Sequence, residues 1–239
     1  MNRQSNLYTI LYSALLVLAV GIVLALVYQV LRPAQEENIA NDTKRQILAA
    51  ARLTPSEGES ISTLYNDHIT RSFIVNSNGE IVKSDIAPFD VDVAAEIKKP
   101  DNERLLPVFE CSTSNGTKYI LPVYGAGLWG PIWGYIAFDN NGNTIYGAYF
   151  AHQGETPGLG AEIEKPAFSN QFQGKQIFSG TGAFESVAVV KTGREPADKP
   201  YVHAISGGTI TSQGVQAMLA NSLEPYAAWL KTLNTSSNN

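Results

Sequence analysis

The stretch ISGGTITSQG, residues 205–214, places four hydroxyl side chains and two adjacent glycines between a strand-like run and an amphipathic helix. The first turn of a helix leaves backbone N–H groups unpaired, so flexible, hydroxyl-rich backbone just before a helix suits an anion such as phosphate. Ser and Thr are also favoured helix caps in any protein, and for this stretch taken alone capping is the commoner reason for their presence. The rest of the chain must decide between the two interpretations.

The helix that follows this stretch is predicted to bury one face, because its apolar residues recur at i, i+3, i+4 and i+8. Pro225 then breaks or kinks it, and a further apolar face continues beyond. The residues expected to be buried are Val215, Met218, Leu219, Leu223, Tyr226, Trp229, Leu230 and Leu233. The Asn- and Ser-rich residues 234–239 are predicted to form a disordered tail.

Turn and strand signals earlier in the chain predict an antiparallel sheet. Asn78-Gly79 and Ser114-Asn115-Gly116 each separate two apolar runs, which is the sequence pattern of a hairpin. Strands are expected within 72–83, 105–111, 119–124, 132–138, 144–151 and 187–190, and helices at 35–53, 91–98 and from about Ala161 onward, covering Phe168 and Phe172. Helices packed on an antiparallel sheet define an α+β fold.

The segment GAGLWG, residues 125–130, matches the dinucleotide fingerprint GxGxxG. That fingerprint requires a helix immediately after the glycines, whereas Pro131 and a β-rich aromatic run follow here. We therefore reject a Rossmann site and predict a glycine-rich loop between two strands. Trp129 in this loop either covers an aromatic ligand or closes the core, and core closure is the expectation.

Composition excludes several classes of function. The formal net charge of −5 argues against a nucleic-acid partner. Cys111 is the single cysteine, which excludes an internal disulfide and a cysteine-based metal cluster. His68, His152 and His203 are far apart and have no metal-ligand spacing, so no metal site is expected.

Residues 7–31 contain no charged side chain, and a helix of this length crosses a hydrocarbon core of about 30 Å. A cleaved signal peptide is the alternative, but the apolar run exceeds the usual length of about 7–15 residues and lacks a small-x-small cleavage site. We expect an uncleaved anchor at 1–33, followed by a domain at 34–233. Positive-inside counting favours a cytoplasmic N-terminus, with the domain outside the cytoplasmic membrane.

Four segments in this order resemble the FMN-binding domain family, which comprises the C subunits of sodium-translocating NADH:quinone oxidoreductases and the G subunits of Rnf electron-transport complexes. They are GLWGP at 127–131, ETPGLG at 155–160, Lys191, and SGGT at 206–209. Together with the N-terminal anchor, the resemblance covers nearly the whole chain. Two positions depart from the family pattern: Gly208 replaces the usual Ala, and His203 replaces an Asp.

The resemblance implies that FMN is bound covalently through a phosphoester to Thr209, with Thr211 as the nearest alternative acceptor. It also implies a cofactor site in which backbone N–H groups hold the phosphate and apolar side chains pack on the isoalloxazine ring. Glu155 and Thr156 are candidates for hydrogen bonds to the ring, and Lys191 for neutralising charge. The full implied set is Thr209, Ser206, Gly207, Gly208, Ile210, Thr211, Ser212, Glu155, Thr156, Gly158, Leu159, Trp129 and Lys191.

The implied function is that of an electron-carrying subunit of a sodium-pumping NADH:quinone oxidoreductase in the bacterial inner membrane, without its own NADH site or catalytic acid–base pair. Its implied partners are the other subunits, a flavin transferase and membrane lipid. A Thr hydroxyl is a poor nucleophile without a nearby base, which favours attachment by a separate enzyme. The alternatives are an Rnf-type G subunit and a flavin-free membrane-tethered sensor or binding module.

Overall fold

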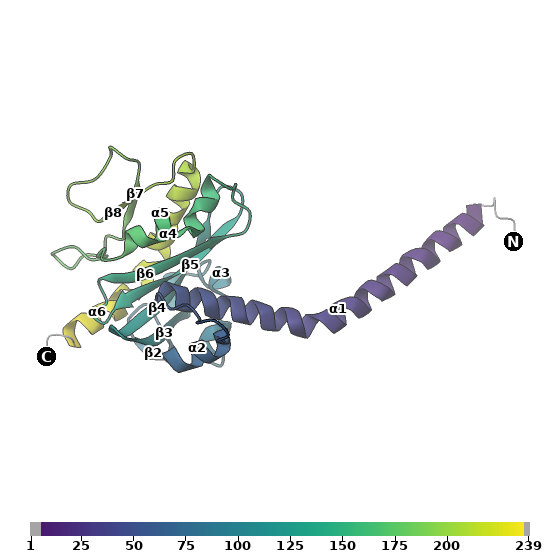
Figure 1. Cartoon of the computed structure of the whole chain (residues 1–239), viewed down its shortest axis with the longest axis horizontal. Coiled ribbons are helices and arrows are strands. Elements are labelled where there is room, and N and C mark those ends of the chain that lie inside the picture. The colour runs from purple at the N-terminus through teal and green to yellow at the C-terminus, as the bar shows by residue number, and fades with distance from the viewer. Residues whose placement is uncertain (1–5, 237–239) are drawn as a thin grey trace. The chain divides into compact units, whose positions relative to one another are not determined.

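The computed structural model describes residues 6–236, which divide into two compact units at Thr43/Lys44 (Figure 1). The α-helices are α1 (Asn6–Ala50), α2 (Ile61–His68), α3 (Val93–Glu96), α4 (Pro166–Ser169), α5 (Thr209–Leu223) and α6 (Ala227–Ser236). The strands are β1 (Ile69–Val75), β2 (Ile81–Val82), β3 (Leu106–Thr113), β4 (Gly116–Ala126), β5 (Pro131–Asp139), β6 (Ile145–His152), β7 (Ala188–Val190) and β8 (Tyr201–His203). Short 3-10 turns lie at Pro88–Asp90, Asp101–Glu103, Gly160–Glu164, Asn170–Phe172 and Glu224–Tyr226.

The described part of the first unit, residues 6–43, is helical. Its apolar part is long enough to cross a membrane and is exposed in the isolated chain. Pro33 lies inside α1 and does not end it, so the helix runs on to Ala50. Proline has no N–H, so the helix lacks one backbone hydrogen bond at Pro33. Arg32 and Glu36, one helical turn apart on either side of Pro33, form an ion pair of 2.8 Å. The predicted anchor and the predicted helix at 35–53 are therefore one element. At the other end of the chain, α6 extends to Ser236, so 234–236 are helical, while 237–239 lie outside the described residues.

A six-stranded sheet forms the centre of the second unit, with strand order β2-β1-β3-β4-β5-β6 and every neighbouring pair antiparallel. Both predicted hairpins are present: Ile74 pairs with Val82 across the Asn78-Gly79 turn, and Thr113 pairs with Gly116. The strands expected from 132–138 and 144–151 are β5 and β6. The α+β prediction is confirmed.

The sheet has a hydrophobic core on each face. Ile120 and Leu121 are consecutive in β4, and because strand side chains alternate they enter opposite cores. The Leu121 core is covered by α5, α6 and the 3-10 turn between them. As the helical spacing predicts, the buried residues here are Val215, Met218, Leu219, Leu223, Tyr226, Trp229 and Leu230, with Leu233 partly buried. The Ile120 core is covered by the last turn of α1, whose Ile47 and Ala50 are fully buried.

A helix was expected from Ala161, but the structure has two 3-10 turns and a four-residue helix at Gly160–Phe172. Pro166 begins the short α4 because proline is tolerated in the first turn of a helix and not in its interior. Phe168 and Phe172 are nevertheless buried, and both pack against Phe150 of β6, with ring centroids 5.7 and 5.1 Å away.

The strands β7 and β8 pair in parallel as a separate two-stranded sheet, which the sequence did not predict. Side-chain amides of two glutamines complete their hydrogen bonding. Gln216 Oε1 accepts from Val189 N–H at 2.9 Å. Gln171 Oε1 accepts from His203 N–H at 2.8 Å, and its Nε2 donates to His203 C=O at 3.5 Å. The β8 end that leads to α5 is thereby held in place.

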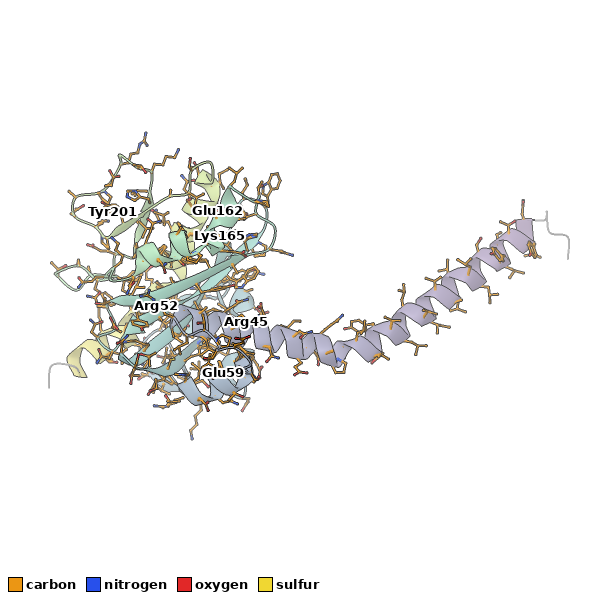
Figure 2. The ribbon with its side chains drawn as sticks, viewed as in Figure 1. Arg45, Arg52, Glu59, Glu162, Lys165 and Tyr201 are labelled. Carbon is orange, nitrogen blue, oxygen red and sulfur yellow. The ribbon has the colours of Figure 1, made fainter. Side chains whose placement is uncertain are left out.

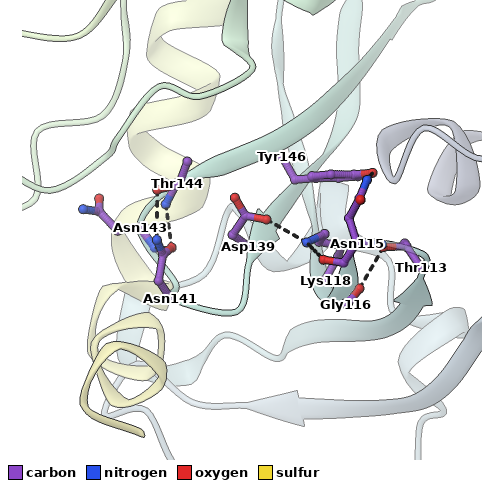
Figure 3. Close-up of polar contacts among 9 residues, drawn as sticks. All are labelled: Thr113, Asn115, Gly116, Lys118, Asp139, Asn141, Asn143, Thr144 and Tyr146. Carbon is purple, nitrogen blue, oxygen red and sulfur yellow. Dashed lines mark hydrogen bonds and ion pairs between the residues drawn. The ribbon is translucent and has the colours of Figure 1, made fainter. Parts of the chain in front are cut away.

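One buried lysine organises the turns at the end of the sheet (Figure 3). Lys118 Nζ donates to the Asn115 carbonyl at 2.6 Å, pairs with Asp139 at 2.8 Å and lies 4.5 Å from the centre of the Tyr146 ring. An ammonium this deeply buried needs several partners, because desolvation is otherwise unfavourable. Burial also raises the pKa of nearby Cys111 to about 11, while Lys118 lowers it to a smaller extent.

We predict that Gly142→Ala destabilises the domain much more than Gly116→Ala. Both glycines have positive φ, 64° and 87°, so each substitution costs about 1–2 kcal/mol of backbone strain. A Cβ at Gly142 would lie 2.2 Å from the Leu230 carbonyl oxygen, whereas a Cβ at Gly116 meets nothing within 4 Å. The added overlap is worth about 1–3 kcal/mol, which thermal unfolding of the detergent-solubilised chain measures. Equal losses would contradict the packing of α6 on this turn.

Candidate functional site

Three loops meet around a cavity of about 200 Å³. They are the β4–β5 loop at 127–130, the loop after β6 at 153–160, and the loop between β8 and α5 at 204–208. The cavity is lined by Leu128, Glu155, Thr156, Leu159, Gly160, Gly207, Gly208, Thr209, Ile210 and Thr211. The segments that the sequence analysis singled out far apart in the chain are thus neighbours in space.

Close backbone packing places the start of α5 beside the β4–β5 loop. A Cβ on Gly125 would lie 2.7 Å from Met218 Cβ, and a Cβ on Gly214 would lie 2.3 Å from the Ala126 carbonyl oxygen. Only glycine therefore allows β4 and α5 to approach this closely. The loop itself closes with a 2.8 Å hydrogen bond from Gly127 N–H to the Gly130 carbonyl and leads directly into β5, which confirms the rejection of a Rossmann site.

Glu155 joins its own loop to the β4–β5 loop and to the first turn of α5 through its carboxylate. Its Oε1 accepts from the Trp129 N–H at 2.8 Å, and its Oε2 accepts from the Thr211 hydroxyl at 2.5 Å. The side chain is only 4% exposed, and glycines make room for it: a Cβ on Gly160 would lie 2.2 Å from Oε2. Glu155, which the family resemblance implies as a candidate for a hydrogen bond to the flavin ring, thus has both carboxylate oxygens bonded to the protein.

Helix α5 begins without a side-chain cap. Gly208 occupies the N-cap position and no hydroxyl accepts from the first turn, so the capping interpretation is wrong. Ser212 instead accepts from the N–H of Ile205 at 3.0 Å, which ties the preceding loop to the helix. Within the described residues, the N–H groups of Thr209, Ile210 and Thr211 have no hydrogen-bond acceptor, as expected for an open helix N-terminus.

The two threonines that were candidates for cofactor attachment differ in their surroundings. Thr211 is 1% exposed and its hydroxyl donates to Glu155. Thr209 is half-buried, lines the cavity, and its hydroxyl makes no hydrogen bond to any residue from 6 to 236. Of the two hydroxyls, only that of Thr209 is both accessible and free.

Exposed apolar side chains surround the cavity. Trp129 is 68% exposed, so the expectation that it closes the core is wrong. Leu128, Leu159 and Ile210 line the cavity and are also exposed, which is unusual for large apolar residues grouped at one place. Gly207, with φ of 74°, accommodates Leu159: a Cβ there would lie 2.5 Å from Leu159 Cδ2.

Several predicted site residues do not line the cavity. Four of them are exposed and absent from the lining: Lys191, Ser206, Gly158 and Trp129. Ser212 is also absent from the lining, but it is buried. Gly158 donates its N–H to Glu162 at 3.2 Å and so shapes the loop from outside. Glu162 and Lys165, labelled in Figure 2, follow this loop and do not line the cavity either.

His203 lies just before the β8–α5 loop, with its Nδ1 3.7 Å from Glu195 Oε1. The N–H groups of Gly193 and of Glu195 itself lower the pKa of the Glu195 carboxyl, and His203 adds a smaller lowering. A carboxylate from the β7–β8 loop therefore stands beside the histidine. Among residues 6–236, no group of three or more His, Cys, Asp or Glu is placed to hold a metal ion.

A model of the family described as FMN-binding domain matches residues 127–224, which contain all three loops. The C subunit of the Na(+)-translocating NADH-quinone reductase from Yersinia pestis is 33% identical over 234 residues, covering 90% of this chain and 87% of that protein. The chain belongs to the family of these C subunits. The crystal structure of the C subunit from Parabacteroides distasonis is 51% identical with a TM-score of 0.77, covering 84% of this chain and 96% of that one. NqrC of Shewanella oneidensis is 26% identical with a TM-score of 0.68, covering 82% and 98%.

For this member of the C-subunit family, sequence reasoning missed Leu128 and Gly160 as lining residues, although both stand inside the motifs that carried the resemblance. A signal for Gly160 existed, because a second glycine two positions after Gly158 serves no turn of its own. The structure shows why glycine is needed there: a Cβ on Gly160 would overlap Glu155 Oε2 and the Thr211 hydroxyl oxygen.

We predict that Thr211→Val lowers the free energy of unfolding by about 1–3 kcal/mol, or roughly 3–10 °C in melting temperature. The substitution leaves the buried Glu155 Oε2 without its donor, although the side-chain shape is kept. Thr209→Val is the matched control, and because its hydroxyl makes no hydrogen bond we expect a change within about 0.5 kcal/mol. Equal melting temperatures for the two variants would show that the Glu155–Thr211 hydrogen bond contributes nothing.

Proposed function

We propose that this chain is the electron-transfer subunit of a Na+-translocating NADH-quinone reductase and carries FMN through a phosphoester to Thr209. Membership of the C-subunit family and the match to the FMN-binding domain over 127–224 support the complex and the cofactor. The observation that carries the attachment site is the Thr209 hydroxyl, which is free, lines the cavity and stands at the open end of α5.

The residues present fit the phosphate. Three unpaired N–H groups, those of Thr209, Ile210 and Thr211, point to a site for an anion at the N-terminus of a 15-residue helix. Gly207 has a φ of 74°, a conformation that most residues with a side chain avoid. Because it has no side chain, it leaves room for the phosphate to reach these N–H groups.

The residues also fit a flat aromatic ring. A cavity of about 200 Å³ encloses only part of a molecule the size of FMN, so the ring system extends over the rim. Leu128, Leu159 and Trp129 are the exposed apolar side chains available to cover it. When bound, the flavin supplies the one-electron chemistry, and the protein supplies its position and surroundings.

Attachment requires a separate flavin transferase. Glu155 is the one carboxylate in the cavity lining, and it accepts from Thr211 and Trp129, leaving no base for Thr209. The Thr209 Oγ–phosphorus bond forms as the bond from an activated flavin phosphate to its leaving group breaks, and the hydroxyl proton passes to a base of the transferase.

The N-terminal part of α1 serves as a single membrane anchor in this proposal, in contact with lipid at 1–33, and the domain stands on the extracytoplasmic side of the bacterial inner membrane. The remaining subunits of the reductase are the electron-transfer partners. The relatives described above are C subunits, which favours this complex over the Rnf type.

Co-expression with a matched flavin transferase tests the attachment. Wild-type protein is expected to give a fluorescent band that survives denaturing electrophoresis, and Thr209→Ala to abolish it. Thr211→Ala and Ser206→Ala should keep the band, because each leaves the Thr209 hydroxyl in place. A band that persists in Thr209→Ala, or an unlabelled wild type beside a labelled positive control, would refute the proposed linkage.

A further inference from the structure

The cavity contains one ionisable side chain and no basic one. Its lining consists of Glu155, hydroxyl residues, glycines and apolar residues, and neither Lys165 nor Lys191 reaches it. Phosphate sites usually place Lys or Arg against the anion in addition to backbone N–H groups. Here the only full charge in the cavity lining is negative, so the backbone N–H groups at the start of α5 are the groups that favour a phosphate, and Glu155 opposes additional negative charge.

The position of that charge is fixed. Glu155 is 4% exposed, and both carboxylate oxygens are held, one by the Trp129 N–H and the other by the hydroxyl of Thr211. Thr211 also supplies one of the three free N–H groups of the first turn of α5, so the carboxylate and the proposed phosphate position share a residue. A helix N-terminus carries about half a positive charge, and Glu155 already compensates it.

A free flavin phosphate and an attached one differ in charge. A phosphate monoester carries about −2 above its second pKa of roughly 6, whereas a phosphodiester carries a single negative charge. Repulsion by a fixed carboxylate therefore acts about twice as strongly on the free cofactor as on the attached one. Attachment also raises the effective concentration of the flavin at the cavity, which offsets the remaining repulsion.

We propose that Glu155 is a specificity-determining residue that rejects the free dianionic flavin phosphate and admits the singly charged phosphodiester formed at Thr209. Glu155 thus has two roles. It joins its own loop to the β4–β5 loop and to the start of α5, and it allows the cavity to fill only when the flavin is covalently attached. This inference rests on the proposed function, because it takes FMN as the occupant of the cavity.

The charge dependence is tested on the full-length Thr209→Ala chain in detergent, which lacks the acceptor hydroxyl. Equilibrium dialysis at pH 8 compares three probes: riboflavin, FMN, and the methyl phosphodiester of FMN. With Glu155 intact, the methyl ester is expected to bind at least about fivefold more tightly than FMN, although it differs only by a methyl group and one charge. Equal affinity, or tighter binding of FMN, would overturn the proposal, and so would the absence of measurable binding for all three probes.

The same titrations with Glu155→Gln assign the effect to the side chain. Gln keeps the shape and one acceptor oxygen for the Trp129 N–H, and its NH2 group can donate to the Thr211 hydroxyl oxygen, so the loops remain joined, which the melting temperature checks. FMN affinity is expected to rise about tenfold while riboflavin affinity changes less than about twofold. Glu162→Gln is the matched control, since it removes one charge from the same segment outside the cavity, and it should leave the FMN-to-riboflavin ratio unchanged. A parallel rise for FMN and riboflavin, or the same shift in the control, would refute the role of Glu155.

The proposed covalent attachment is tested by a separate experiment, the fluorescent band of the wild-type chain after co-expression with the transferase. A labelled wild type together with equal affinities for FMN and its methyl ester would leave the function standing and refute the role of Glu155. An unlabelled wild type would refute the covalent linkage whatever the dialysis shows.

Discussion

The hydrogen bonds of the buried Glu155 carboxylate are the constraint on which the arrangement of the site depends. They join the β4–β5 loop, the loop after β6 and the first turn of α5, which are separated in sequence by 26 and 56 residues. A carboxylate can be buried this way only when its oxygens find donors, and here one donor is backbone and the other a side chain. Glycines at 127 and 160 leave the space the carboxylate needs. Two loops without regular structure are therefore joined to each other and to the start of a helix.

Beneath these loops, the sheet is stabilised from both faces. The last turn of α1 belongs to the second core, where Gln46 accepts from the Trp133 indole N–H at 3.0 Å and Gly147 makes room for the Ala50 carbonyl. Trp133 stands in β5 next to Ile132, which is buried below the cavity loops. A helix that begins as a membrane anchor thus ends as part of the hydrophobic core of the domain.

Sequence patterns predicted the features that local chemistry controls. Asn78-Gly79 and the turn at Gly116 specify hairpins through the positive φ of their glycines, and the buried face of α5 follows from its spacing. The parallel pairing of β7 with β8 had no local signal, because it is completed by Gln171 and Gln216 from other elements. Trp129 was predicted to be buried but is exposed, because the hydrophobicity of a side chain indicates a preference for burial and does not show whether its loop packs against the core. The difference between Thr209 and Thr211 likewise depends on Glu155, which is distant in sequence.

The side-chain amide of Gln171 lies along β8 as a neighbouring strand would, accepting from the N–H of His203 and donating to its carbonyl. An open strand edge is a template for pairing with another chain, and proteins that cannot cover such an edge risk aggregation. In the proposed function a flavin transferase must reach the loop between this strand and Thr209, which a whole structural element covering the strand would hinder. Gln171 bonds the backbone N–H and carbonyl of His203 at the end of β8. These groups are therefore not available to pair with an incoming peptide, while the loop that follows β8 stays accessible.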